Sequence, residues 1–322
     1  MGEDNYRRAV TLNSASIGKG TAIAALEYQT YDGPWTDIDE DVKKKNANLR
    51  YIVPIFDGEL AISGMAYENS WNSADQVPAR AIESGLIDRL GSIDTQVGGE
   101  SSRYSLSAQY NSDTVNASLY AIDTDLTLFS NFTYFLDNPE TGDQFEQADD
   151  RKIYGGELST TLPFAVTQGS SITLGGQWRY DDIGNVGLYR TQNLVRLSTI
   201  REDAIDSSSY AAFAQSNIVL SDSLTLSLGG RYDYFDIEVD SQIAANSGDE
   251  KDGMFSLKAG LKYQFTDTMT MFANIGQGYH SNDARGVTIT QDPTTGESIA
   301  PAPLLVRSLG YETGINWTDN KT

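Results

Sequence analysis

The segment LTLSLGGRYDY, residues 224–234, decides how the rest of the sequence is interpreted. Apolar or aromatic side chains recur at alternate positions from Leu224 to Tyr234, and polar residues such as Arg231 and Asp233 lie between them. A period of two places successive side chains on opposite faces of a β-strand. The segment is therefore predicted to be a strand with one apolar face and one polar face.

The same alternation recurs along the chain, most clearly in FSLKAGLKYQF, residues 255–265, and also in residues 172–180 and 104–110. We expect about thirteen such strands, each roughly ten residues long, which is the length that a tilted strand needs to cross a bilayer. Apolar side chains would face lipid, and polar side chains would face a wet lumen. The pattern predicts an all-β fold, a transmembrane antiparallel β-barrel.

The connections between these strands alternate between tight turns and long polar loops. Turn sequences at residues 111–114, 220–223 and 265–268 predict short links at one rim. Short periplasmic turns and long extracellular loops are typical of outer-membrane barrels. The predicted long loops are residues 32–45, 71–99, 137–150, 195–206, 240–251 and 280–303.

Composition excludes several classes of protein. The 322 residues carry 45 acidic and 23 basic side chains, a formal net charge of -22, which opposes nucleic-acid binding. Cysteine is absent, so disulfides and thiolate metal sites are excluded. We expect residues 1–322 to be part of a single barrel domain, with no plug domain present.

Several longer motifs carry a family resemblance. They include residues 26–35, 70–94 and 128–151, and above all GQGYHSNDARG, residues 276–286, with the returning segment PAPLLVRSLGYET, residues 301–313. Together these stretches resemble the barrel of TonB-dependent outer-membrane receptors. Such receptors also carry a signal peptide, an energy-coupling box, a plug and further strands, so the resemblance implies that this chain is a fragment of the barrel.

The resemblance also implies a location, a function and partners. It places the chain in the bacterial outer membrane, in contact with lipid and lipopolysaccharide, as part of a non-enzymatic receptor without a cofactor. The complete receptor would take up a bulky nutrient, most simply a ferric siderophore or a similar metal chelate. Energy would come from the TonB complex, which acts through the plug.

Five residues are candidates for ligand contact. His280, Asp283 and Arg285 lie where a strand meets a long loop, and Trp71 and Arg80 belong to another long loop. His280 is the sole histidine, so a catalytic triad would have to use it, yet neighbouring Ser and Asp residues in sequence do not make a triad. We expect these side chains to contact a ligand and not to perform catalysis.

Charged residues on the polar faces of the strands form a second group of candidates. They would face the lumen and hold a plug or line a substrate path, or they would simply pair across neighbouring strands. The residues are Arg103, Arg179, Asp181, Arg231, Asp233 and Lys258.

An acidic loop offers a weak metal motif. Asp37, Asp39 and Asp41 have the spacing that opens a calcium loop, but Val42 stands where that loop needs Gly and Asn48 where it needs Glu. We therefore predict a solvated acidic loop and no metal site.

Two other functions share parts of this pattern. A passive porin-like barrel would show the same alternation and loop asymmetry without a plug. A soluble, secreted glycan-binding β-protein would turn its apolar faces inward instead.

Overall fold

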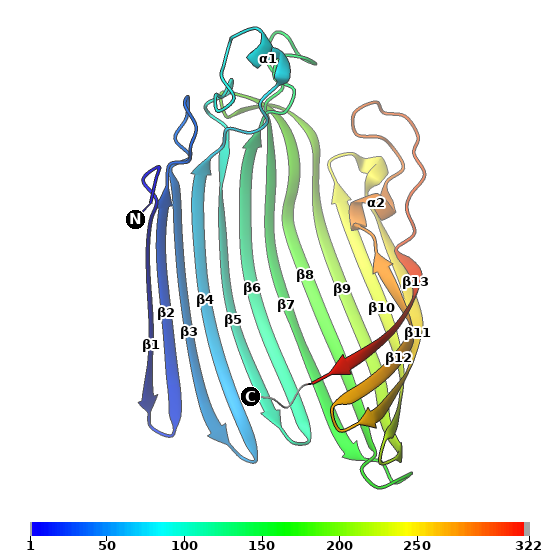
Figure 1. Cartoon of the computed structure of the whole chain (residues 1–322). Coiled ribbons are helices and arrows are strands. Elements are labelled where there is room, and N and C mark those ends of the chain that lie inside the picture. The colour runs from blue at the N-terminus through cyan, green and yellow to red at the C-terminus, as the bar shows by residue number, and fades with distance from the viewer. Residues whose placement is uncertain (1, 319–322) are drawn as a thin grey trace.

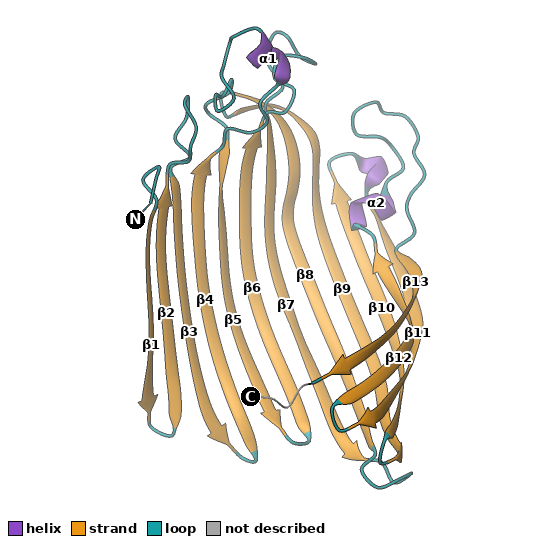
Figure 2. Ribbon diagram, viewed as in Figure 1, coloured by secondary structure: helices purple, strands orange, loops and turns teal. Residues whose placement is uncertain are grey.

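The computed structural model describes residues 2–318 and consists almost entirely of β-strands (Figures 1 and 2). Thirteen strands form one antiparallel sheet in chain order, which confirms the predicted fold class and strand number. The strands are β1 Arg7–Ile17, β2 Gly20–Tyr31, β3 Val42–Ile55, β4 Gly58–Asn72, β5 Gly98–Ser112, β6 Val115–Ser130, β7 Phe145–Pro163, β8 Ser171–Gln192, β9 Val195–Ser221, β10 Leu224–Ser241, β11 Gly248–Thr266, β12 Met269–Ser281 and β13 Leu305–Trp317.

Helical structure is confined to the loops at one rim. It comprises α1 (Ala79–Glu83), a single 3₁₀ turn, η1 (Ala244–Asn246), and α2 (Ala284–Thr288). None of the helices in residues 2–318 is long and apolar enough to cross a membrane.

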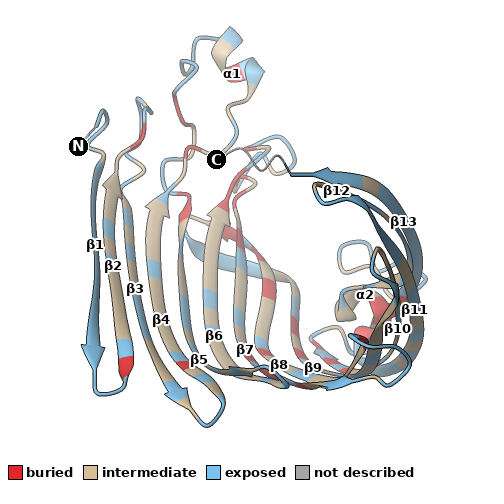
Figure 3. Cartoon of the chain, turned by 60° about the horizontal axis from the view of Figure 1, so that its bottom comes forward, coloured by how far each residue is buried: buried red, intermediate tan, exposed pale blue. Residues whose placement is uncertain are grey.

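The sheet curves strongly, most of all from β9 to β13, and α2 lies on its concave side (Figure 3). This curvature follows from strand twist accumulated over many neighbours. Within residues 2–318, β1 and β13 are not paired with each other, so the sheet is open.

The strand register keeps the two faces chemically distinct. In β10, Tyr232 is 47% exposed on the convex face, whereas its neighbour Asp233 is 2% exposed on the concave face. Many leucines on other strands share the convex face and are exposed there, as Leu106, Leu158 and Leu257 show. An apolar surface of this extent requires contact with lipid. It results from the alternation of apolar and polar side chains seen in residues 224–234.

The rims differ as expected, with two corrections. The loop predicted over residues 240–251 is limited to residues 242–247, because β10 ends at Ser241 and β11 begins at Gly248. The predicted tight turns join β5 to β6, β9 to β10 and β11 to β12. Residues 195–206, however, are not a loop but the first part of β9. They pair with β8 through a turn in which Asn193 and Leu194 both have positive φ, as two-residue hairpins of this kind require.

The β8–β9 hairpin is long because it continues beyond the membrane. β8 has 22 residues and β9 has 27, whereas a bilayer needs only about ten residues per strand. Above the bilayer both faces meet water, so polar sequence no longer distinguishes strand from loop. Arg196 on β9 stabilises this extension, since it lies 3.7 Å from the centre of the Tyr189 ring and donates two hydrogen bonds to Glu146.

Candidate functional site

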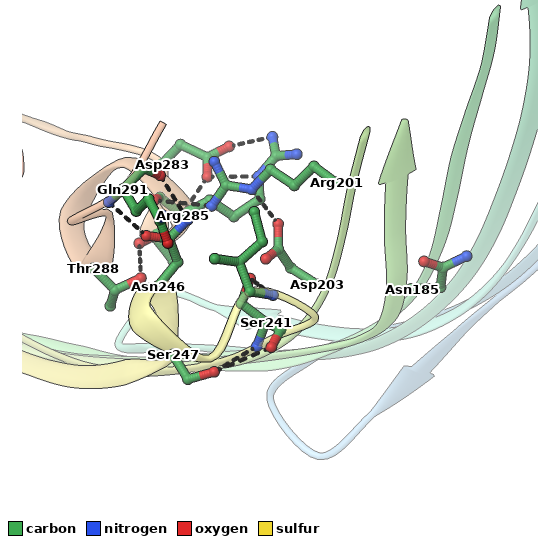
Figure 4. A network of polar contacts seen from close by, with 12 residues as sticks. Asn185, Arg201, Asp203, Ser241, Asn246, Ser247, Asp283, Arg285, Thr288 and Gln291 are labelled. Carbon is green, nitrogen blue, oxygen red and sulfur yellow. Dashed lines mark hydrogen bonds and ion pairs between the residues drawn. The ribbon is translucent and has the colours of Figure 1, made fainter. Parts of the chain in front are cut away.

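The loop between β12 and β13, residues 282–304, folds inward over the concave face of the sheet (Figures 3 and 4). Its α2 helix begins at Ala284 and is capped by Asp283, whose carboxylate accepts a hydrogen bond from the backbone N–H of Arg285. Val287 and Leu304 are buried against Ile237 of β10. Burial of these apolar side chains stabilises the contact between the loop and the sheet.

A fully buried asparagine fixes the far side of this loop. Asn246, at the end of η1, accepts hydrogen bonds from the N–H groups of Thr290 (3.0 Å) and Gln291 (2.9 Å), and its side chain donates to the carbonyl of Gln291 (2.9 Å). On the near side, Arg201 of β9 donates to the carbonyl of Arg285 at 3.1 Å (Figure 4). The sequence contains no signal for these contacts, because the partners lie 44–84 residues apart.

The concave face carries a series of Arg–Asp ion pairs that run along the strands. Residues two positions apart share a face and lie about 7 Å apart, within reach of a guanidinium group. Pairing across neighbouring strands was the expected alternative, but these ions pair within their own strand or loop. The pairs are Arg151–Asp149 (2.8 Å), Arg179–Asp181 (2.6 Å), Arg201–Asp203 (2.5 Å), Arg231–Asp233 (2.8 Å) and Arg285–Asp283 (2.8 Å).

Two of these pairs, Arg179–Asp181 and Arg285–Asp283, meet at a cavity of about 440 Å³ between the inward loop and the strands of the sheet. Arg179 uses its Nε and Nη2 atoms on Asp181, and Arg285 uses the same two atoms on Asp283. Each guanidinium group therefore keeps further N–H donors for a ligand. The lining is completed by polar and apolar side chains, namely Arg151, Ile183, Val186, Ile205, Ser207, Ser209, Phe235, Ser281 and Ala284.

The loop pair stays ionised over a wide range of pH. The Arg285 guanidinium donates to Asp283 and lowers the pKa of that carboxyl, although burial opposes this. The same hydrogen bond raises the pKa of Arg285. The cavity thus combines fixed charges of both signs with apolar surface, a combination suited to a polar ligand of moderate size.

The structure brings some of the predicted ligand contacts together and separates the others. Asp283 and Arg285 line the cavity, and His280 lies just before them, exposed, at the end of β12 opposite Val306. Arg80 belongs to α1, in the other loop cluster, which lies apart from α2 in Figure 1. Trp71, predicted to lie in the same loop, instead belongs to the last part of β4 and pairs with Gly99 of β5.

The remaining predicted lumen residues share the concave face but differ in their contacts. Lys258 donates to the Gln215 side chain at 2.6 Å. Arg103 is opposite Tyr67 and Thr124 in the register, is exposed, and has no ion-pair partner in the part of the chain that the structure describes.

The loop cluster around α1 is built on hydrogen bonds between loops. Asp94 accepts from the side chains of Asn131 and Gln144, both at 2.9 Å, and Arg80 donates to the carbonyl of Thr133 at 2.7 Å. Tyr134 is almost fully buried there, and this burial raises its pKa to about 12. These contacts tie the loop of residues 73–97 to that of residues 131–144.

The three acidic residues with calcium-loop spacing are used separately. Asp37 accepts a hydrogen bond from the N–H of Ser92, the Asp39 carbonyl accepts one from Asn72, and Asp41 pairs with Lys43. No group of three or more His, Cys, Asp or Glu residues within residues 2–318 is placed to hold a metal ion.

Comparison with known proteins identifies the family of this chain. Residues 21–322 match the family model described as TonB dependent receptor-like, beta-barrel. No curated protein sequence matches the chain. The family consists of transport receptors of the bacterial outer membrane and not of enzymes, which removes the soluble glycan-binding alternative.

Solved structures share the fold at low sequence identity. The copper transporter OprC is 14% identical over 99% of this chain and 50% of its own, with a TM-score of 0.71. The siderophore receptor PiuA from Acinetobacter baumannii is 12% identical over 98% and 53%, with a TM-score of 0.70. The ferric yersiniabactin uptake receptor FyuA from Yersinia pestis is 14% identical over 99% and 51%, with a TM-score of 0.66.

The chain spans about half the length of these structures. Its thirteen antiparallel strands, lipid-facing convex side and asymmetric rims match the barrel part of such receptors. The chain belongs to the family of TonB-dependent receptors of the bacterial outer membrane, as part of their β-barrel.

Proposed function

We propose that this chain supplies wall and extracellular ligand-binding loops to a receptor for the energy-coupled uptake of a bulky nutrient, a ferric siderophore or a similar metal chelate. Family membership supports the transport of such a cargo, and the titles of the structural neighbours name siderophores and copper for those proteins. The observation that supports this proposal most directly is the cavity under the inward loop. Paired guanidinium and carboxylate groups line it together with apolar side chains.

We further propose that all of residues 1–322 belong to one barrel domain and that the concave face is the side toward the lumen. The Arg–Asp pairs on that face would make it polar while keeping its net charge close to zero. A plug, supplied by the complete receptor, would lie against this face and connect it to the TonB complex.

Within the cavity, Asp283 and Arg285 would bind the cargo, and His280 would contact it at the rim. A chelate presents hydroxyl, carboxylate or amide oxygens, and the free N–H donors of a paired guanidinium group fit those acceptors. Arg80, from the α1 cluster, and Trp71, near the end of β4, would contact the cargo on its way into the barrel.

The test is uptake of radioactive iron chelates by cells that carry the complete receptor and no other. Catecholate, hydroxamate and carboxylate chelates are compared before and after the proton gradient is dissipated. We expect one class to enter and to stop entering when the gradient is lost. Uptake that continues at an unchanged rate without the gradient would replace this proposal with a passive porin.

A further inference from the structure

The three arginines that line the cavity under the inward loop hold their carboxylate partners in the same way. Arg151, Arg179 and Arg285 each donate from Nε and Nη2 to the Asp two positions away in the chain. Among residues 2–318, the Nη1 atoms of these three groups have no hydrogen-bond partner. The cavity therefore offers free N–H donors whose positive charge is already balanced by a carboxylate.

The net charge of the cavity is close to zero although three guanidinium groups line it. Asp181 and Asp283 line it as well, and Asp149 lies 2.8 Å from Arg151. The other lining side chains are apolar or carry a hydroxyl group. Donors are thus present without the positive field that would attract a multiply charged anion.

An anion would have to break one of these pairs to meet an unbalanced positive charge. The Asp181 carboxylate is only 11% exposed, and Arg179 donates two hydrogen bonds to it, at 2.6 and 2.7 Å. A carboxylate this buried is strongly destabilising when its guanidinium partner turns away. An uncharged oxygen acceptor avoids that cost, because Nη1 can donate to it while the pair stays intact.

The loops at the same rim add a negative field on the approach to the cavity. Residues 32–41, 73–97, 131–144 and 282–304, which connect strands there, contain 15 acidic and 3 basic side chains. An excess of one charge around a cleft lowers the local concentration of ligands of the same sign. A cargo with several negative charges is therefore disfavoured both on its approach and inside the cavity.

We propose that this cavity selects a ferric chelate without net negative charge, a tris-hydroxamate complex, over anionic catecholate and hydroxycarboxylate complexes. This inference rests on the proposed transport function and narrows its cargo. Three hydroxamates cancel the charge of the ferric ion, whereas three catecholates leave the complex with three negative charges. Apolar side chains of the cavity, such as Ile183, Ile205 and Phe235, suit the methylene spacers that join hydroxamate groups.

The test uses chelates that differ in charge but share the same iron coordination. A linear tris-hydroxamate with a terminal amine forms a cationic ferric complex, its N-acetyl derivative a neutral one, and its N-succinyl derivative an anionic one. A ferric tris-catecholate serves as the strongly anionic probe. Binding of each complex to the complete receptor in detergent is measured by quenching of tryptophan fluorescence, at low and at high salt.

The neutral complex should bind well, and the cationic complex should bind at least as tightly. We expect the N-succinyl complex to bind about tenfold more weakly than the neutral one at low salt. This difference should shrink at high salt, because screening weakens the repulsion by the acidic loops. The tris-catecholate complex should bind more weakly than every hydroxamate complex.

A charge variant assigns this selectivity to the cavity. Asp181→Asn/Asp283→Asn unbalances the positive charges of Arg179 and Arg285, so affinity for the N-succinyl complex should rise about tenfold. Affinity for the neutral complex should stay the same. The amide oxygen at position 283 can still accept from the N–H of Arg285, so the cap of α2 is kept.

The matched control is Glu68→Gln/Asp236→Asn. It removes the same number of negative charges and breaks two ion pairs, those of Glu68 with Lys45 and of Asp236 with Lys251, outside the cavity. The control should keep the discrimination of the unaltered receptor. Folding of each variant is verified by its resistance to SDS before heating.

The possible failures of the two proposals differ. Equal affinity for the N-acetyl and N-succinyl complexes, or tightest binding of the tris-catecholate, would overturn the charge selection and leave the transport proposal intact. Equal effects of the two double variants would also overturn it, because the selectivity would not come from the cavity. Binding of none of these chelates would contradict the transport proposal itself, and the charge selection with it.

Discussion

Asn246 and Gln291 are joined by two hydrogen bonds although 45 residues separate them. The Asn246 side chain accepts from the N–H of Gln291 and donates to its carbonyl, both at 2.9 Å, as a neighbouring strand would do. This amide therefore holds the β12–β13 loop in its inward position over the cavity.

Replacing this amide should release the loop. Asn246→Ala removes three hydrogen bonds and leaves backbone groups of Thr290 and Gln291 without partners, at a cost of about 2–4 kcal/mol. We expect faster hydrogen exchange in residues 284–304. Asn274→Ala, at an exposed position of β12, is the control. Unchanged exchange in Asn246→Ala would mean that apolar packing alone holds the loop.

Removing the loop guanidinium should weaken cargo binding. Arg285→Ala takes away ligand donors and leaves the Asp283 carboxylate unpaired at the cavity, so affinity for the transported chelate should fall about tenfold. Titration of the complete receptor with chelate, followed by tryptophan fluorescence, measures this change.

Two further variants test whether the unpaired Asp283 carboxylate, and not only the loss of the Arg285 donors, weakens binding in that cavity. Asp283→Asn/Arg285→Ala removes both charges, and it should bind better than Arg285→Ala alone if the unpaired carboxylate repels the chelate. Lys251→Gln lies on the convex face and should bind normally. Normal binding by Arg285→Ala would exclude this cavity as the cargo site.

Acid should loosen the loop of residues 131–144. Asp143 is partly buried, yet its pKa lies below the usual value because N–H groups of Leu136, Asp137 and Asn138 and the Thr133 hydroxyl donate to it. A lowered pKa means that the stabilisation is complete above the unfolded value of about 4 and is lost as the pH falls through the folded pKa.

Hydrogen exchange, corrected for its intrinsic pH dependence, follows this opening. Asp143→Asn should show the loosened loop already at neutral pH, because an amide cannot accept all of these hydrogen bonds. Asp137→Asn changes an exposed side chain and should behave like the unaltered protein. A loop equally protected at pH 3 and pH 7 would contradict the prediction.

Glycine on the concave face should be required where an aromatic ring covers it. A Cβ at Gly155 of β7 would collide with the Tyr120 ring of β6, whereas a Cβ at Gly310 of β13 would meet nothing within 4 Å. We expect Gly155→Ala to destabilise the barrel by about 1–3 kcal/mol and Gly310→Ala to be tolerated. The temperature at which the folded form is lost on SDS gels distinguishes them, and equal temperatures would show that Tyr120 simply turns away.

Much of the fold can be predicted from the sequence, because apolar and polar side chains alternate along a membrane-spanning strand. Alternation over residues 224–234 and 255–265 identifies both strands and assigns each side chain to a face. This alternation disappears where the bilayer ends, because both faces of β9 meet water over residues 195–206. The polar sequence of this segment therefore predicts a loop, although the segment is a strand.

The candidate site is less predictable than the fold. The two-residue spacing of Arg179 and Asp181 places both on one face, but the spacing alone does not decide between pairing along the strand and pairing across strands. The sequence names Asp283 and Arg285 as candidates for ligand contact, but it does not reveal the cavity that they line, because the other lining residues come from strands far away in the chain.

The sequence by itself determined the strands, their faces, their membrane environment and their family, because these depend on residues close together in the chain. Only the tertiary structure decided that residues 282–304 turn inward and meet Asn246, Arg201 and Ile237. Those contacts depend on the curvature of the sheet, which brings β9 and β10 beneath the β12–β13 loop, and no local pattern of residues encodes such an approach.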